Sequence, residues 1–216
     1  MLLWGAAAGA SGVLGLSLLY RALATTVAAV ASPAAALVGA AAPVIAGALM
    51  GEQPGITGWI GIGVAIPAVL LLTVGQREGE GTKRALVLGV LAGLGFGAFF
   101  ILISRTSPSS GLWPLASSKV ISILIALTVV LISGKRARVN PPSRLPAIAA
   151  GVLDMGANVL FLIATRVGLL AISGVVSSLY PAPTVILASL LDRQKLPPLR
   201  IVGLILALAG VAMMTL

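Results

Sequence analysis

The stretch APVIAGALMGEQPGITGWIGIGVAI, residues 42–66, decides the fold, because it joins two apolar segments through a short polar turn. Gly51, Glu52, Pro54 and Gly55 gather in the turn, and such residues end one helix and let the next begin. Extended on both sides, each segment reaches about 20 mostly apolar residues, the length that a bilayer-spanning helix needs. The stretch therefore predicts two consecutive membrane-spanning helices.

The rest of the chain has the same character. It is 59% hydrophobic and 9% charged, with a mean hydropathy of +1.14, whereas soluble domains are about 45–50% apolar and about 25% charged. We therefore predict an all-α, polytopic transmembrane helix bundle. Cutting the chain at its polar and Pro-rich interruptions predicts about eight spans, at residues 2–20, 26–50, 57–75, 84–105, 112–134, 145–165, 169–191 and 199–216.

The amino-acid composition also argues against several classes of function. The chain contains no cysteine and no histidine, which removes thiolate chemistry and the commonest metal ligands and general base. Its basic residues do not gather on a polar domain, so no nucleic-acid partner is expected. No nucleotide-binding Gly-x-x-x-x-Gly-Lys-[Ser/Thr] loop is present. We predict no cofactor and no metal, and we rank an integral-membrane enzyme last.

An internal repeat relates the two ends of the chain. Pro43, Glu52 and Gly63 recur at a constant offset as Pro183, Asp192 and Gly203. At this offset, the helices predicted at 84–105 and 112–134 have counterparts that would lie ahead of Met1. The pattern predicts two inverted repeats. An incomplete repeat of three helices covers residues 1–75, a loop covers 76–83, and a complete repeat of five helices covers 84–216.

These residues resemble the EamA-type transporters of the drug/metabolite transporter superfamily. The family pattern has two five-helix repeats, each closing with Pro, an apolar helix, Gly-Glu, a short turn and a Gly-bearing helix. Gly51-Glu52 matches this pattern, whereas Leu191-Asp192-Arg193 departs from it. The resemblance implies that the first two of ten helices are missing. A truncated or misannotated start, a degenerate gene and a true eight-helix transporter are the three explanations.

Composition and loop charges predict which membrane holds the protein and how the protein is oriented in it. Arginine outnumbers lysine and alanine and glycine are abundant, which suggests a GC-rich bacterial genome and the inner (cytoplasmic) membrane. The stretch from Met1 lacks a basic leader, so no cleavable signal peptide is expected. Eleven basic residues fall on one predicted face and two on the other. The positive-inside rule then places both termini outside, while the resemblance implies cytoplasmic termini, and both orientations stay open.

One carboxylate and one amine fall inside predicted spans, where ionisable residues are costly and indicate function. Asp154 lies roughly 13–15 Å into its helix, and Asn158 follows one turn later on the same face. Lys119 differs from Asp154 in depth by about 5 Å, which a lysine side chain can bridge. We predict that Asp154 carries a coupled proton or binds a cationic group. A structural ion pair, or a lysine reaching to the interface, is the alternative.

Prolines interrupt the seventh predicted span. Pro181 and Pro183 remove backbone donors, and the freed carbonyls need protein or a watery cavity to satisfy them. Ser177 and Tyr180 precede this break and are predicted to line a substrate path, with a simple kink as the alternative. Pro43 is a further predicted hinge or kink.

The favoured function is a secondary carrier that moves a small metabolite or amphipathic compound, driven by an ion gradient or by the substrate's own gradient. An inactive or truncated scaffold without transport is the alternative. The expected partners are the lipid bilayer and a small-molecule solute. Protons as coupling ion and association into a homo-oligomer both stay open.

Overall fold

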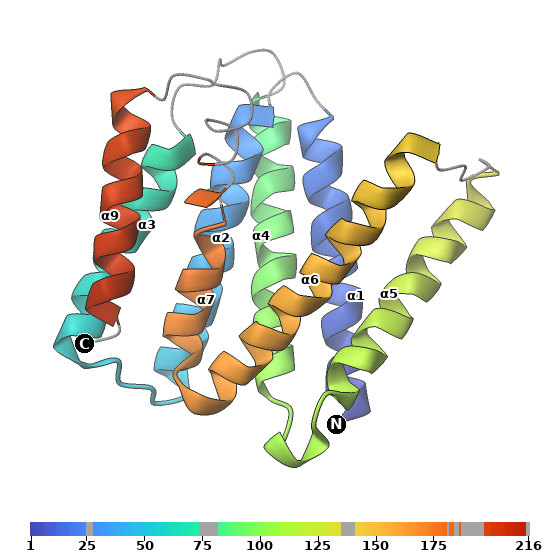
Figure 1. Cartoon of the computed structure of the whole chain (residues 1–216), viewed down its shortest axis with the longest axis horizontal. Helices are drawn as coiled ribbons and strands as arrows, with labels where there is room; N and C mark the ends of the chain where they lie inside the picture. Colours follow the sequence, from blue (N-terminus) through green and yellow to red (C-terminus); the bar gives the residue numbers. More distant parts are fainter. Residues whose placement is uncertain are drawn as a thin grey trace.

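The computed structural model describes residues 1–24, 28–73, 82–134, 141–180, 182–183, 186 and 197–214 of the 216-residue chain. Regular structure in these ranges is helical throughout, with the helices running up and down beside one another (Figure 1). This confirms the all-α prediction. The helices are α1 (Leu2–Leu23), α2 (Ala28–Leu49), α3 (Gly55–Thr73), α4 (Thr82–Ser104), the short 3-10 helix η1 (Pro108–Ser110), α5 (Trp113–Ile132), α6 (Pro141–Val167), α7 (Leu170–Ser178) and α9 (Pro198–Met214).

Four helices in the described part of the chain are long and apolar enough to cross a membrane: α1, Lys83–Ser104 of α4, α5 and α6. Three shorter apolar segments accompany them, at Ala34–Leu49, Gly55–Leu71 and Pro198–Met214. The start of α1 and the end of α9 lie at the same end of the bundle (Figure 1). The protein is a multi-pass helical membrane protein.

Prolines begin helices at two of the predicted breaks. The sequence places a loop over residues 135–144, but α6 already starts at Pro141, and α9 starts at Pro198. The first residues of a helix have no intrahelical partner for their amide groups, so a proline without an N–H fits there. The predicted start of the sixth span near Leu145 is therefore four residues too late.

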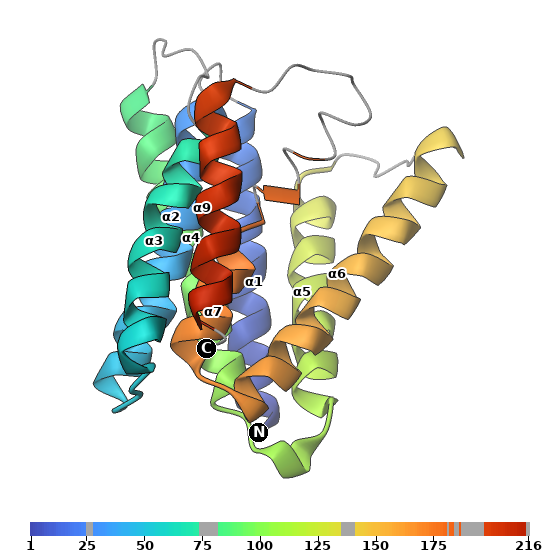
Figure 2. The ribbon, with the colours of Figure 1, turned by 60° about the vertical axis from the view of Figure 1, so that its left-hand side comes forward.

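Small residues hold the centre of the bundle together. Helix α4 packs between α1 and α2, and α3 packs against α9 (Figures 1 and 2). A side-chain carbon on Gly95 of α4 would lie 2.7 Å from the Cα of Gly15 on α1, and one on Gly93 would lie 2.6 Å from the carbonyl oxygen of Ala35 on α2. Only glycine allows this approach, and close backbone contact is what associates helices in membranes.

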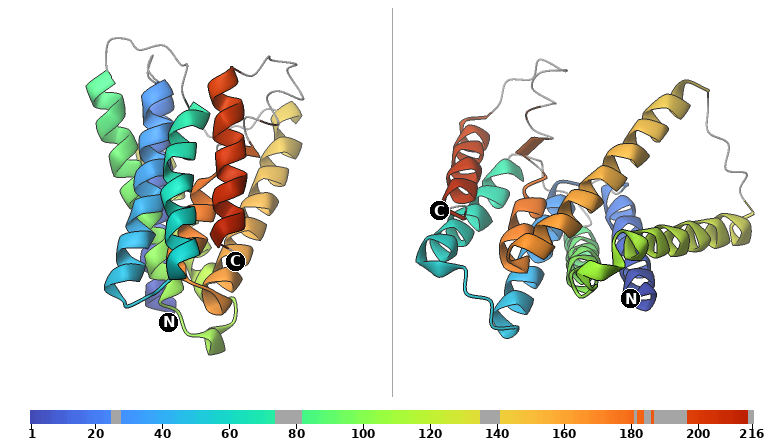
Figure 3. Two further views of the ribbon diagram at one scale, coloured as in Figure 1. Left: turned by 90° about the vertical axis from the view of Figure 1, so that its left-hand side faces the viewer. Right: turned by 60° about the horizontal axis from the view of Figure 1, so that its bottom comes forward.

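Helices α5 and α6 diverge from one another and from this centre (Figure 3). The start of α5 packs on α1, while α6 is exposed over most of its first two thirds and becomes buried at Phe161 and Leu162. Those two side chains join a core cluster with Ile103 and Leu115. Lys119 of α5 and Asp154 of α6 form an ion pair that bridges the two helices.

The predicted repeat pairs α1 with α6, α2 with α7 and α3 with α9. In each pair the two helices run in opposite directions through the bundle (Figure 1). An inverted repeat requires this relation, but any even number of intervening passes, such as the four between α1 and α6, produces it as well. The division of the chain at residues 75 and 84 stays a prediction.

Candidate substrate site

A cavity of 460 Å³ lies among α1, α4, α5 and α6, at mid-height of the bundle. We refer to it as the charged cavity, because Lys119 and Asp154 form part of its wall. Its volume falls within the range of about 300–1,000 Å³ that is typical of small-molecule sites. The lining residues are Gly9, Gly12, Val13, Leu16, Phe96, Phe99, Phe100, Ser118, Lys119, Ser122, Ile123, Ala126, Asp154 and Asn158.

The structure brings Lys119, Asp154 and Asn158 together. The Lys119 Nζ lies 2.5 Å from Asp154 Oδ2. The Asn158 side-chain amide donates to Asp154 Oδ1 over 3.2 Å and to the Asp154 carbonyl oxygen over 2.7 Å, since it follows one helical turn later. Both carboxylate oxygens therefore have a partner. The side chains are still 33% exposed for Lys119 and 62% exposed for Asp154, so the protein leaves the pair partly uncovered.

Close packing of α1 on α5 presents polar groups to the charged cavity. A side-chain carbon on Gly9 would lie 2.2 Å from the carbonyl oxygen of Ser118, so only glycine fits. The hydroxyl of Ser122 donates to the Gly9 carbonyl oxygen over 3.1 Å. Ser118 and Ser122 therefore stand one turn apart on α5, with Lys119 beside them and paired with Asp154 of α6.

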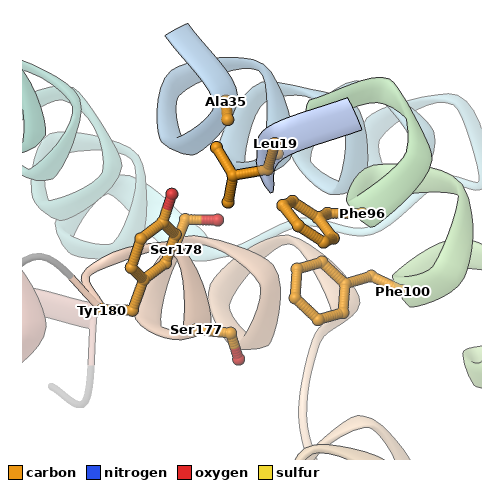
Figure 4. A pocket seen from close by; sticks show the side chains of 8 residues that line it. Leu19, Ala35, Phe96, Phe100, Ser177, Ser178 and Tyr180 are labelled. Carbon is orange, nitrogen blue, oxygen red and sulfur yellow. The ribbon is translucent and has the colours of Figure 1, made fainter. Parts of the chain in front are cut away.

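A second cavity, of 260 Å³, is lined by the side chains drawn in Figure 4. We call it the inner cavity. The rings of Phe96 and Phe100 line both cavities, and the Tyr180 hydroxyl donates to the Ser32 carbonyl oxygen over 3.4 Å. The lining residues are Leu19, Ala35, Gly39, Phe96, Phe100, Ser177, Ser178 and Tyr180.

Ser177 and Tyr180, which the sequence predicts to line a substrate path, both line the inner cavity. Ser177 and Tyr180 also line a third cavity, of 350 Å³, between the end of α7 and helix α9. Pro183 lies in the wall of this third cavity, and Pro181 lies outside the described residues. Ser177 and Tyr180 therefore stand where two cavities adjoin, although their role in transport stays a prediction.

Pro43 is buried in α2 and packs against α7. A side-chain carbon on Gly174 would lie 2.4 Å from the Cβ of Pro43. The ring therefore fits into a notch that glycine leaves in the neighbouring helix. This contact does not test the prediction that Pro43 acts as a hinge or kink.

The sequence model of the EamA-like transporter family matches residues 83–216, from the beginning of α4 to the end of the chain and more than half of its length. The chain belongs to the EamA-like transporter family. This family is part of the drug/metabolite transporter superfamily, and its members are membrane transporters of small substrates and not enzymes. No curated protein matches the chain significantly.

The part of the chain that matches the family contributes most of the candidate site. It includes Lys119, Asp154 and Asn158 of the charged cavity and Ser177 and Tyr180 of the inner one. Helices α1 and α2, which precede the matched part, complete the walls with small and aliphatic side chains. Among the described residues, no three His, Cys, Asp or Glu side chains lie together as a metal site would need.

Sequence reasoning missed the aromatic residues of the site. The chain has four phenylalanines. Phe96, Phe99 and Phe100 line the charged cavity, and Phe161 packs against Phe100 with 4.4 Å between ring centroids. A signal was available, because three of the four stand within five residues of a chain that is only 4% aromatic. The sequence alone could not show that Phe161, from another helix, joins them.

Proposed function

We propose that this transporter is a secondary carrier that moves a small amphipathic solute across the cytoplasmic membrane. The observation that carries the proposal is the partly uncovered Lys119–Asp154 pair in the wall of the charged cavity. Charges within a membrane span are costly and almost always face a protein interior or a watery cavity. An ion pair that is placed within the membrane despite this free-energy cost, and that the protein leaves partly uncovered, fits a site where a substrate or proton replaces Lys119 on Asp154.

The exchange would take place on the carboxylate. Asp154 binds Lys119 when the site is empty, and a substrate ammonium group or a proton competes for the same oxygen atoms. Asn158 donates to Oδ1 and keeps the carboxylate oriented while its partner changes. Competition of this kind couples substrate movement to a proton gradient, or lets the substrate move down its own gradient.

The remainder of the cavity favours an apolar substrate body. Phe96, Phe99 and Phe100 supply aromatic rings to the cavity wall, and the other lining side chains apart from the charged pair, Asn158 and two serines are small or aliphatic. Ring faces also attract cationic groups that come within about 6 Å of the ring centroid. A small cation with an apolar part therefore satisfies both walls of the cavity.

Flux into proteoliposomes tests the proposal. The 216-residue protein is reconstituted, a proton gradient is imposed, and uptake of a panel of radiolabelled amines and amino acids is measured. We expect flux of at least one compound, and we expect Asp154→Asn to reduce it about tenfold or more and to remove its pH dependence. The matched control is Glu80→Gln, which removes a carboxylate from the predicted connecting loop and should leave flux unchanged.

Two outcomes count against the proposal. Flux and pH dependence that persist in Asp154→Asn would show that Asp154 neither couples nor binds. Folded wild-type protein that moves no compound of the panel, with or without the gradient, would favour the scaffold alternative.

A further inference from the structure

The charged and inner cavities share two lining side chains from one helix. Phe96 and Phe100 stand one turn apart on α4, and each lines both cavities. Figure 4 shows the two rings side by side on one wall of the inner cavity, with Ser178 and Tyr180 across from them. The exposed lining of the inner cavity is almost wholly apolar. A solute that moves directly from Lys119 and Asp154 to this space meets the two rings, because they line both cavities.

The backbone that carries these rings is held in place. Gly93 and Gly95 bring α4 into direct backbone contact with α2 on one side and α1 on the other. A shift of α4 would therefore have to displace both neighbouring helices, because tightly packed interiors transmit strain. Rotation of the phenylalanine side chains is the motion that this packing leaves open.

Phe100 is restrained from the opposite side by Phe161 of α6. Their ring centroids are 4.4 Å apart and the planes are tilted by 33°, and Phe161 is only 6% exposed. Phe161 follows Asp154 by two helical turns, so both side chains project from the same face of α6. If α6 shifts as one rigid helix, the movement that separates Asp154 from Lys119 also draws Phe161 away from Phe100.

We propose that Phe96 and Phe100 form an aromatic partition between the two cavities, and that Phe161 positions this partition according to whether Lys119 and Asp154 are paired. The inference rests on the proposed carrier function and adds a gating device to it. With the pair closed, Phe161 holds Phe100 across the passage. When a cation or proton replaces Lys119 on Asp154, α6 moves and the ring of Phe100 is free to turn.

Thiol accessibility tests the partition without any transport assay. The chain contains no cysteine, so single cysteines report alone. Ser178→Cys places a thiol in the inner cavity, where the serine is 2% exposed, and Ser122→Cys places one in the charged cavity. A small cationic methanethiosulfonate reagent is added to the reconstituted full-length protein, and the rate of modification is followed by mass spectrometry.

We expect Ser178→Cys to react at least about tenfold more slowly than Ser122→Cys, because burial limits thiol reactivity. Adding Phe100→Ala should bring the two rates within about twofold of each other. The matched control is Leu94→Ala on the same helix, since Leu94 is exposed, lines neither cavity and should leave the Ser178→Cys rate unchanged. Equal rates at the two cysteines in the parent protein, or no acceleration by Phe100→Ala, would overturn the partition.

A second set of variants tests the link to the ion pair. Asp154→Asn should accelerate modification of Ser178→Cys, and Phe161→Ala should do the same and abolish any further effect of Asp154→Asn. Additive effects of the two changes would show that Phe161 does not transmit the state of the pair. Because modification needs no flux, the partition can stand if the carrier proposal fails, and the carrier proposal can stand if the partition fails.

Discussion

The Glu52 carboxylate accepts a hydrogen bond from the amide of Leu170, 118 residues further along the chain, with 2.8 Å between Oε1 and the nitrogen. Its other oxygen, Oε2, accepts from the Ala171 amide over 2.9 Å. These amides belong to the first turn of α7, where helix amide groups lack intrahelical partners and a negative charge is favoured. Glu52 therefore ties the turn between α2 and α3 to the start of α7, and Gly47 leaves room for it, since a side-chain carbon there would lie 2.3 Å from Oε2.

Removing this carboxylate should destabilise the protein. We expect Glu52→Ala to lower the free energy of unfolding by about 1–2 kcal/mol, the range found for lost helix caps. Glu52→Gln keeps one acceptor oxygen and should lose less. Denaturant titration in detergent measures the difference, with the exposed neighbour Gln53→Ala as the control. Equal stability of Glu52→Ala and Gln53→Ala would mean that the cap contributes nothing.

The Lys119–Asp154 pair should show strong coupling in a double-mutant cycle. Asp154→Leu leaves the lysine charge within the span without its partner, and an unpaired charge at the centre of a helix costs roughly 2.5–3.5 kcal/mol on insertion scales. The matching change Lys119→Met leaves the Asp154 carboxylate without its cationic partner. We expect each single variant to melt at a lower temperature than the double variant, which regains stability but not transport. If the decrease in melting temperature of the double variant equals the sum of the decreases of the two single variants, Lys119 and Asp154 do not interact directly.

Two glycines allow a matched test of packing. Gly95→Ala introduces a carbon that would lie 2.7 Å from the Cα of Gly15, whereas nothing lies within 4 Å of the equivalent carbon at Gly156. We expect Gly95→Ala to destabilise by about 1–3 kcal/mol through overpacking. Gly156→Ala should stabilise by up to about 1 kcal/mol, because alanine favours the helix. Thermal melting of both variants in the same detergent checks the sign of each effect.

Arg166 at the end of α6 forms hydrogen bonds to the segment that connects α4 and α5. Its guanidinium Nη2 donates to the carbonyl oxygen of Gly111 over 2.6 Å and to that of Ser107 over 3.4 Å. We expect Arg166→Met to speed hydrogen exchange of the amides of residues 107–111 about tenfold, because local opening becomes easier. The exposed Arg105 offers a control, since Arg105→Met should leave exchange in this segment unchanged. Unchanged exchange in both variants would mean that the segment holds its conformation without Arg166.

The charged pair could be anticipated from the sequence, while the aromatic partition could not. Lys119 and Asp154 are rare ionisable residues in apolar spans, and the rise of a helix places them at similar depth. Phe100 and Phe161 are two apolar residues among many, and nothing local indicates that they touch. Glu52 was assigned only to a turn, because its partners on α7 are distant in the sequence.

The sequence by itself determined the helical class, the positions of α1, α4, α5 and α6 within a few residues, the family, and the presence of two charged side chains within apolar helices. These properties depend on local hydropathy and on the constant rise of a helix. Only the tertiary structure decided which helices are neighbours, where α5 and α6 diverge, and which rings line both cavities. The reason is that these helices are apolar on nearly every side, so periodicity does not mark an inward face. Their neighbours are chosen by close contacts at small residues such as Gly95 and Gly15.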